Sequence, residues 1–150
     1  MKVEKALLED ADSLTVLTIR SKSYWGYTKE QLEGWEEDLK ISAHYISVNN
    51  VYKLILNDEI AGFYSFYSES TAKIRLDFFF VESKFIGNGY GKEMFCCFIN
   101  QVKELNCKTV ILDADPNDKG FYTKNGFKVV REIETSIKNR CFQVMELIVF

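Results

Sequence analysis

Proline, histidine and long apolar runs are scarce in this sequence. There is one proline and one histidine among 150 residues, and no apolar run approaches the ~18 residues of a membrane span. Scarce proline and 47% hydrophobic residues argue against disorder. The formal net charge of -3 lacks the basic excess of nucleic-acid-binding proteins. Because the N-terminal MKVEKALLEDAD is also unlike a signal peptide, we expect a cytoplasmic protein with neither a membrane nor a nucleic-acid partner.

The four cysteines argue against a metal or redox centre. Cys96, Cys97, Cys107 and Cys141 include no pair with C-x-x-C spacing. Cys96 and Cys97 are adjacent, so they point in different directions on a helix. We expect buried, reduced thiols of a cytosolic protein and no bound metal.

The length and the pattern of apolar residues favour one domain over residues 1–150. No linker, repeat or low-complexity segment interrupts the chain. The predicted strands are 3–8, 51–56, 60–67, 74–81, 109–114, 127–134 and 141–150. The predicted helices run from a cap at Asp10 or Asp12 to Ser21, from Thr28 to Leu39, from Lys92 to Asn106 and from Asp118 to Asn125.

Local signals support these elements and their pairing. Thr28 and Gln31 fit a capping box, and the residues NDE join two strands as a hairpin. The run IRLDFFFV predicts a strand covered on both faces, and Gly126 is placed to end the last helix. The strand-helix-strand order over 74–114 implies parallel pairing, whereas the hairpins imply antiparallel pairing. The fold class is therefore α/β, a mixed, mostly antiparallel sheet of about seven strands with helices on both faces.

The segment IGNGYGKEMFCCFI, residues 86–99, places three glycines ahead of a helix-like run. The first turn of a helix has unpaired N–H groups, and glycines let an anion approach them. A dinucleotide motif would need glycine at Lys92 or Met94, and a P-loop would need glycine at Ile86 and Ser or Thr at Glu93, so both patterns fail. The helix is expected to bury Met94, Phe95, Phe98, Val102 and Leu105.

A third glycine pattern fits the segment. Ile86 to Gly91 resembles the Q/R-x-x-G-x-G/A signature of the GCN5-related N-acetyltransferase (GNAT) superfamily, with Ile86 where Gln or Arg is usual. VESKFIGNGYGKEMF looks like the central motif of the superfamily. LDADPNDKGFYTKNGFKVV looks like its second motif, with Asn117, Tyr122 and Gly126-Phe127 in the matching positions. The resemblance covers nearly the whole chain, and RSKSYWGY and IKNRCFQVMELIV resemble a bacterial branch.

The resemblance implies the αβα three-layer acyl-CoA N-acyltransferase fold and an acetyl-CoA-dependent N-acetyltransferase. The acetyl group would pass from acetyl-CoA to a primary amine by direct attack in a ternary complex. The acceptor would be a small-molecule or peptide amine, which the residues do not identify. Members are often dimers, so a homodimer is a further expectation.

The resemblance also assigns site residues. The backbone at the end of strand 74–81 would hold the thioester, the loop amides the pyrophosphate, and Asn117 the pantetheine amides. Tyr122 would act as the general acid that protonates the leaving thiolate. The expected cofactor-binding set is Phe79, Phe80, Val81, Ile86, Gly87, Asn88, Gly89, Tyr90, Gly91, Lys92, Asn117 and Tyr122.

The acceptor amine, with a pKa near ~10, must lose a proton before it attacks. Asp77 is the candidate base, and its carboxylate is expected to face the cleft or to pair with Arg75. Glu82 is expected to be a solvated loop residue, and His44 to have a structural or exposed role. A water relay without a dedicated base is the alternative.

Aromatic residues in the early helical region are candidates for the acceptor site. Tyr24, Trp25 and Tyr27 lie in the region that covers this site in the superfamily, whereas Trp35 is expected to pack in the core. Two other functions compete with catalysis. One is a noncatalytic acyl-CoA-binding or sensor module of the same fold, and the other is a different α/β nucleotide-binding protein.

Overall fold

The computed structural model describes residues 1–134 and 141–149. Its contacts divide the chain into two compact units. The first unit comprises residues 1–66 and 78–98, and the second comprises 67–77 and 99–150. A single domain over 1–150 stays a prediction.

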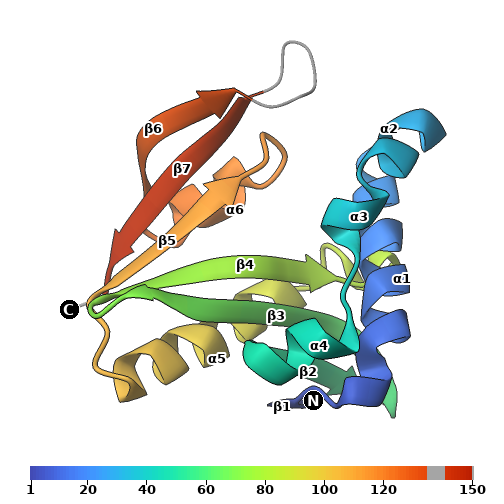
Figure 1. The fold of residues 1–150 in the computed structure, drawn as a ribbon, viewed down its shortest axis with the longest axis horizontal. Helices are drawn as coiled ribbons and strands as arrows, with labels where there is room; N and C mark the ends of the chain where they lie inside the picture. Colours follow the sequence, from blue (N-terminus) through green and yellow to red (C-terminus); the bar gives the residue numbers. More distant parts are fainter. Residues whose placement is uncertain (135–140, 150) are drawn as a thin grey trace. The chain divides into compact units, whose positions relative to one another are not determined.

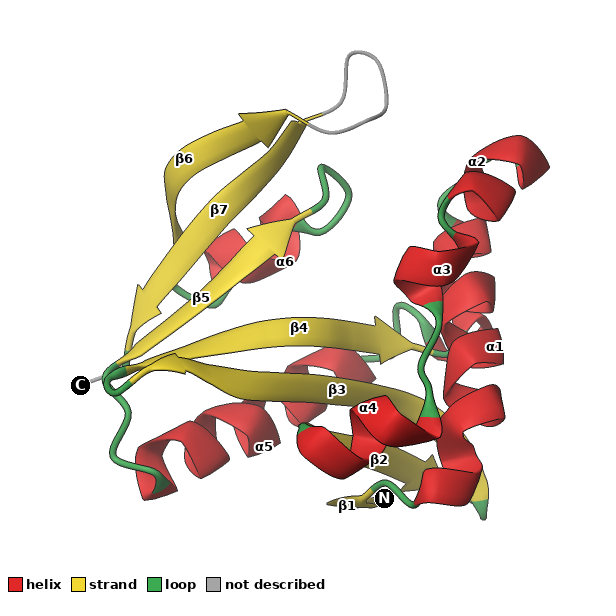
Figure 2. Ribbon diagram, in the orientation of Figure 1, coloured by secondary structure: helices red, strands yellow, loops and turns green. Residues whose placement is uncertain are grey.

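The strands form one seven-stranded sheet in the order β1-β2-β3-β4-β5-β7-β6. The pair β4–β5 is parallel, and the pairs β1–β2, β2–β3, β5–β7 and β6–β7 are antiparallel. The predicted mixed, mostly antiparallel sheet is therefore confirmed (Figures 1 and 2). The strands are β1 (Lys2–Lys5), β2 (Asn50–Leu56), β3 (Glu59–Ser70), β4 (Lys73–Val81), β5 (Thr109–Ala114), β6 (Lys128–Glu134) and β7 (Cys141–Ile148).

Six α-helices and two short 3₁₀ turns accompany the strands in the described part of the chain. The 3₁₀ turns are Leu8–Asp10 and Ser83–Phe85. The helices are α1 (Ala11–Tyr24), α2 (Lys29–Gly34), α3 (Glu36–Leu39), α4 (Ala43–Val48), α5 (Tyr90–Glu104) and α6 (Lys119–Lys124).

One face of the sheet in the first unit packs against α1 and α4. Leu14 and Leu17 of α1 and Ile46 of α4 form a buried cluster with Val51 of β2 and Phe63 of β3. Side chains alternate between faces along a strand, so Tyr64 points to the face opposite to that of Phe63. The N-terminal helices α1 and α4 therefore cover the face that carries Phe63.

The opposite face of the first unit packs against α5. Phe98 of α5 lies with its ring centroid 5.7 Å from that of Tyr64 and 5.3 Å from that of Phe66 on β3. Phe79 of β4 and Phe95 of α5 are in edge contact at 6.5 Å. Helices therefore cover both faces of the sheet in this unit, as the apolar run in β4 predicts.

The second unit is organised around β7, which lies between β5 and β6. The β5–β7 register runs from Thr109 opposite Ile148 to Ala114 opposite Gln143. Val144 and Met145 of β7 are both 0% exposed. Neighbouring residues of a strand point to opposite faces, so both faces of β7 are buried at its centre.

Several local predictions are confirmed. The Thr28 hydroxyl accepts the N–H of Gln31 at 3.1 Å, and the Gln31 side chain accepts the N–H of Thr28 at 2.9 Å, so the capping box forms. The hairpin turn between β2 and β3 contains Asn57 and Asp58 at φ 52° and 63°. Positive φ at both central residues is the requirement of a type I′ turn.

Other boundaries differ from the predictions. The first strand ends at Lys5, because Asp10 accepts the N–H of Leu7 at 2.7 Å and turns the chain. The helix predicted from Thr28 to Leu39 is interrupted at Trp35, which caps α2 and precedes α3. Helix α4 was not predicted, although Ser42 caps it by accepting the N–H of Tyr45 at 3.0 Å.

The cysteine prediction is partly wrong. Cys107 is buried as expected, but Cys96 is exposed and Cys97 is only half-buried on α5. The side chain of Cys141 lies outside the described residues, and so does the polar segment TSIKN, residues 135–139, between the last two predicted strands. Within the described residues, no helix is long and apolar enough to cross a membrane, and no three His, Cys, Asp or Glu residues gather where they would hold a metal.

Gly62 on β3 lies close to both β4 and α5, and this close packing predicts the effect of adding a side chain. A Cβ at Gly62 would lie 2.9 Å from the Phe80 carbonyl oxygen and 2.9 Å from the Met94 sulfur. Gly62→Ala should therefore lower the free energy of unfolding by about 1–3 kcal/mol, as overpacking does. Urea denaturation measures this change. The control is Gly34→Ala, since a Cβ at Gly34 meets nothing within 4 Å, and equal midpoints for the two variants would contradict the assignment.

Candidate functional site

The glycine loop lies in the first unit, after β4 and a 3₁₀ turn. Gly87 and Gly89 have φ of 90° and 85°, a conformation that favours glycine. A Cβ at either position would meet nothing within 4 Å. The Asn88 side chain donates to the Phe85 carbonyl at 3.2 Å and braces the loop. The glycines therefore shape the backbone and leave open space beside it.

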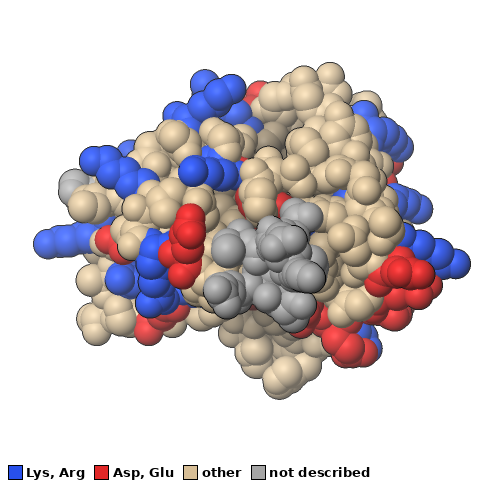
Figure 3. Space-filling model, turned by 90° about the horizontal axis from the view of Figure 1, so that it is seen from above, with Lys and Arg blue, Asp and Glu red and all other residues tan. Residues whose placement is uncertain are grey.

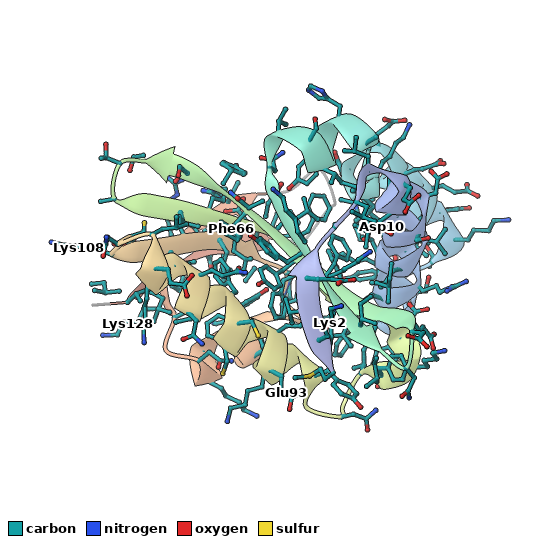
Figure 4. The ribbon with its side chains drawn as sticks, turned by 90° about the horizontal axis from the view of Figure 1, so that it is seen from below. Lys2, Asp10, Phe66, Glu93, Lys108 and Lys128 are labelled. Atoms are coloured by element: carbon teal, nitrogen blue, oxygen red, sulfur yellow. The ribbon has the colours of Figure 1, made fainter. Side chains whose placement is uncertain are left out.

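Helix α5 begins at the end of this loop. The N–H of Glu93 donates to the Gly89 carbonyl at 3.3 Å, so the N–H groups of Tyr90, Gly91 and Lys92 precede the helical hydrogen-bond ladder. Lys92 is exposed and Glu93 lies on the outer side of the helix (Figure 4). Unpaired N–H groups, a helix dipole and open space together fit a phosphate group.

Ile86 departs from the motif without changing the loop amides. Its side chain is half-buried, and its N–H donates to the Ser83 carbonyl at 3.3 Å. Ile86 thus ends the 3₁₀ turn, and its side chain is partly buried. It contributes no side-chain donor, so anion binding depends on the backbone.

The end of β4 leads into this loop. Phe80 lies against Phe63 and Phe78, with ring centroids 6.1 and 6.2 Å away, on the face that α1 covers. Phe79 faces α5, and Val81 is half-buried. The aromatic side chains are core residues, so any ligand contact at this strand end falls to the backbone.

The loop after β5 lies in the second unit and is built on Asp115, which the sequence did not single out. Asp115 is 4% exposed, and its carboxylate accepts the N–H of Asn117 at 3.0 Å. Its carbonyl accepts the N–H groups of Asp118 and Lys119 at 2.8 and 3.2 Å. An Asp two residues before an Asn in D-P-N is an Asx-turn signal that would have identified it. Asn117 itself is exposed.

Tyr122 is fixed by the C-terminal cap of α6. The N–H of Phe127 donates to the Tyr122 carbonyl at 3.1 Å, and the N–H of Gly126 donates to the Thr123 carbonyl at 3.1 Å. Gly126 has φ of 95°, and the rings of Tyr122 and Phe127 lie 5.5 Å apart. These are the two bonds, the left-handed residue and the apolar contact of a Schellman motif. The Gly-Phe pair therefore holds Tyr122, and the predicted role of Gly126 is confirmed.

The Tyr122 phenol is 7% exposed. Burial, and secondarily the charge of Asp118, raises the pKa of Tyr122 well above its ordinary value. The phenol therefore stays protonated at neutral pH and carries a proton that it can donate.

Asp77 lies in the second unit beside other charged groups. Its side chain is exposed. Arg75 on the same strand donates to Glu69 at 2.7 Å and to Asp113 at 2.9 Å. The pKa of Tyr67 is raised, mainly by burial and secondarily by the negative charge of Asp77. The Asp77 carboxylate therefore lies near the Tyr67 phenol. Asp77 thus belongs to a polar cluster with Tyr67, Glu69, Arg75 and Asp113.

Glu82 was expected to be a solvated loop residue, and this prediction is wrong. It is 6% exposed, and Arg20 of α1 donates to its Oε1 at 2.8 Å. Its backbone N–H donates to the Ala61 carbonyl at 2.8 Å. The strand-end position suggested exposure, but α1 comes close enough here to bury the side chain. His44 is exposed on α4, as expected.

The early aromatic residues separate into two groups. Tyr24 and Trp25 are 54% and 43% exposed and contact each other edge-on. Tyr27 and Trp35 are half-buried, with ring centroids 4.8 Å apart. The ammonium of Lys22 lies 5.7 Å from the ring centroid of Tyr27, 5.8 Å from that of Trp35 and 5.7 Å from that of Phe80. Trp35 therefore packs in a cation–π cluster instead of the deep core.

The loop and motif geometry agree with a family model described as an acetyltransferase (GNAT) domain, which matches residues 26–149. The chain belongs to the GNAT acetyltransferase family. This GNAT protein is accordingly an acetyl-CoA-dependent N-acetyltransferase, and the reading as a different nucleotide-binding protein is set aside. No curated protein matches the chain.

Solved structures show the same fold over nearly the whole GNAT chain. The PaiA N-acetyltransferase of Thermoplasma acidophilum, in complex with coenzyme A, is 19% identical with a TM-score of 0.80 over 98% of both chains. An aminoglycoside 6'-N-acetyltransferase complexed with coenzyme A is 16% identical, with a TM-score of 0.74 over 100% of this chain and 98% of that chain. The ribosomal-protein-S18-alanine N-acetyltransferase of Escherichia coli is 12% identical, with a TM-score of 0.76 over 99% of this chain and 93% of that chain.

The predicted site residues of this GNAT protein fall in both units. The glycine loop, the β4 end and the early aromatic residues belong to the first unit, whereas Asp77, Asn117 and Tyr122 belong to the second. The structure places Asn117 and Tyr122 on one short segment after β5. Asp115 and the buried state of Glu82 are the two features that sequence reasoning missed.

The raised pKa of Tyr122 predicts a pH dependence of stability. The folded GNAT protein holds this proton to a higher pH than the unfolded chain does, so the free energy of unfolding should fall as the pH rises above about 10. Tyr122→Phe should lose this component. Urea denaturation at neutral and alkaline pH measures the difference. Tyr24→Phe, at an exposed tyrosine, is the control, and identical alkaline slopes in both variants would refute the assignment.

Proposed function

We propose that this GNAT acetyltransferase transfers the acetyl group of acetyl-CoA directly to a primary amine in a ternary complex. The observation that carries the proposal is Tyr122, a buried phenol that stays protonated at neutral pH and occupies the motif position of the acid. A protonated phenol at this motif position can donate its proton to a leaving thiolate. The thioester of the bound cofactor supplies the activated acetyl group.

Coenzyme A binding is assigned to the loop and the strand end. The backbone from Ile86 to Lys92 would hold the pyrophosphate, supported by the open glycine positions and the start of α5. Lys92 adds a positive charge at this helix end. The backbone of Phe79, Phe80 and Val81 would hold the thioester, and Asn117 the pantetheine amides.

The proposed chemistry is a single acetyl transfer. The neutral amine attacks the carbonyl carbon, a C–N bond forms and the C–S bond breaks. Tyr122 donates its proton to the departing sulfur. A cysteine acyl-enzyme is not part of the proposal, since Cys96 and Cys97 lie on α5 beyond the loop amides.

Asp77 is the proposed acceptor of the amine proton. Its cluster contains three carboxylates, Asp77, Glu69 and Asp113, and one guanidinium, Arg75, which gives a formal charge of -3 + 1 = -2. Negative charge attracts a protonated amine and favours its delivery to a carboxylate. The exposure of Asp77 lets the proton pass on to water.

The acceptor class is a small-molecule or peptide amine. One similar structure is an aminoglycoside acetyltransferase and another is named for a protein alanine, so the fold itself does not select between them. Acidic and basic side chains are both present on the face drawn in Figure 3, where neither sign dominates. Tyr24, Trp25 and Tyr27 are the proposed acceptor-side aromatics, with Tyr24 and Trp25 the more accessible.

We also propose a bacterial, cytoplasmic protein that forms a homodimer without a nucleic-acid partner. The free state of Cys96, Cys97 and Cys107 supports a reducing compartment. Dimer formation rests on the family resemblance, and size-exclusion chromatography with light scattering tests it.

The cofactor assignment is tested by thermal-shift titration. Acetyl-CoA should raise the melting temperature of the protein in a concentration-dependent way, because it binds the folded state. ATP should raise it much less. An acceptor screen that detects the released thiol then identifies the amine.

Tyr122→Phe should lower kcat about a hundredfold, the range of a lost general acid, with acetyl-CoA affinity retained. The phenyl ring keeps the contact with Phe127, so the fold of α6 should persist. Thiol release measures kcat, and thermal shift measures binding. Tyr24→Phe is the matched control. Full activity of Tyr122→Phe would remove Tyr122 as the acid, and absent turnover by the wild type on any amine would favour the noncatalytic module.

Asp77→Asn should lower kcat/KM for the amine about a hundredfold at neutral pH, the range of a lost general base. The defect should shrink as the pH approaches the amine pKa of about 10, because the amine then deprotonates in water. A pH–rate profile measures both effects. Asp58→Asn, in the exposed turn between β2 and β3, is the control. A defect of constant size across the pH range would argue against Asp77 as the base.

A further inference from the structure

The Glu82–Arg20 pair is an ion pair with unused groups on both partners. Glu82 accepts from Arg20 through Oε1 only, at 2.8 Å. Its Oε2 is buried and has no hydrogen-bond partner among the described residues. A buried carboxylate oxygen left unpaired carries a desolvation cost, and such a group calls for a partner.

Arg20 has spare donors on the solvent side. A guanidinium has five N–H donors, and the bond to Glu82 uses one of them. Within the described part of the chain, Glu82 is the partner recorded for Arg20, whose side chain is 61% exposed. Arg20 can therefore bind a second anion, and carboxylates suit its planar fork.

The pair lies beside the proposed thioester-binding strand end. Glu82 directly follows Val81, and its N–H is fixed to the Ala61 carbonyl at 2.8 Å. Phe80 and Glu82 are two residues apart in extended backbone, so their side chains share a face. Both meet cations of α1 there, Lys22 at the Phe80 ring and Arg20 at the Glu82 carboxylate.

The charges of this surface select between ligand classes. The Oε2 atom of Glu82 can accept a hydrogen bond from an N–H donor, and the spare N–H groups of Arg20 can donate to an anion. A simple ammonium ligand would satisfy only the first of these two groups. A zwitterion adds no net charge, and it offers an ammonium to Oε2 and a carboxylate to Arg20.

We infer that Glu82 and Arg20 together bind the ammonium and carboxylate groups of an amino-acid acceptor with an apolar side chain. The inference rests on the proposed acetyl transfer and narrows its acceptor. The ring of Phe80, two residues before Glu82 and on the same face, supplies an apolar surface beside the pair.

Access to the buried oxygen depends on Arg20. Its side chain is mostly exposed, and the ligand ammonium would take the place of the guanidinium as the cation that pairs with the buried Glu82 carboxylate. The ligand carboxylate then replaces water around the guanidinium while the ligand ammonium reaches Oε2. The two contacts reinforce each other, since each ligand charge meets its opposite.

Three probes separate the two contacts. They are L-phenylalanine, 2-phenylethylamine, which lacks the carboxylate, and 3-phenylpropanoate, which lacks the ammonium. Calorimetric titration of the protein saturated with coenzyme A avoids turnover. L-phenylalanine should bind tightest to the wild type.

Two variants should show opposite patterns. Glu82→Gln should weaken L-phenylalanine and 2-phenylethylamine at least tenfold and spare 3-phenylpropanoate. Arg20→Met should weaken L-phenylalanine and 3-phenylpropanoate at least tenfold and spare 2-phenylethylamine. The exposed pair Lys29–Glu33 of α2 supplies the matched controls Glu33→Gln and Lys29→Met, which should change nothing.

The inference is overturned if the wild type binds none of the probes, or if Glu82→Gln binds L-phenylalanine as the wild type does. The second result would leave Glu82 as a structural ion pair. Should Glu82→Gln fail to fold, Glu82→Asp decides, because its shorter carboxylate should weaken both ammonium probes, and full affinity would overturn the inference. Failure of the proposed function is seen separately, as absent binding of coenzyme A in the first titration.

Discussion

The approach of α5 to β3 at Gly62 is the contact on which the first unit depends. The Phe80 carbonyl and the Met94 sulfur come so near that only a residue without a Cβ fits between them. Helix α5 therefore lies directly on the strands. The ring of Phe98 on this helix packs against the rings of Tyr64 and Phe66 on β3. Because the helix is fixed in this way, its first turn opens where β4 ends. The loop needs little more than conformational freedom, which its glycines supply.

The two units contribute different chemistry to this acetyltransferase. The first holds the loop amides, the end of β4 and the Arg20–Glu82 pair, which are the groups proposed to bind and orient the ligands. The second holds Tyr122 and Asp77, which are the groups proposed to move protons. A buried phenol and an exposed carboxylate are suited to opposite tasks, since burial keeps one protonated and water lets the other exchange its proton.

Much of the fold was readable because its signals are local. The capping box at Thr28, the turn at Asn57–Asp58 and the cap at Gly126 each depend on a few neighbouring residues, and each formed as predicted or with a shift of one or two residues. The misses have different causes. Leu105 was expected in the buried face of α5 but is 59% exposed, because the helix ends at Glu104. Glu82 was predicted to be a loop residue, because no pattern in its own segment indicates that α1 covers it. The roles of Tyr122 as the acid and of the glycine loop as the phosphate site stay predictions from motif resemblance, since a phenol's burial has no local signature.

The Schellman motif also makes the acid inseparable from the folding of its own unit. Helix α6 has six residues, far too few to persist alone in water. Its last turn is closed by Gly126 and Phe127, the residues that lead into β6. The proposed proton donor thus depends on the chain that leads into β6 and not only on the short helix that carries it. If Tyr122 is the acid, catalytic activity reports on whether this cap is intact, and a molecule whose second unit is partly unfolded could keep its glycine loop while being chemically silent.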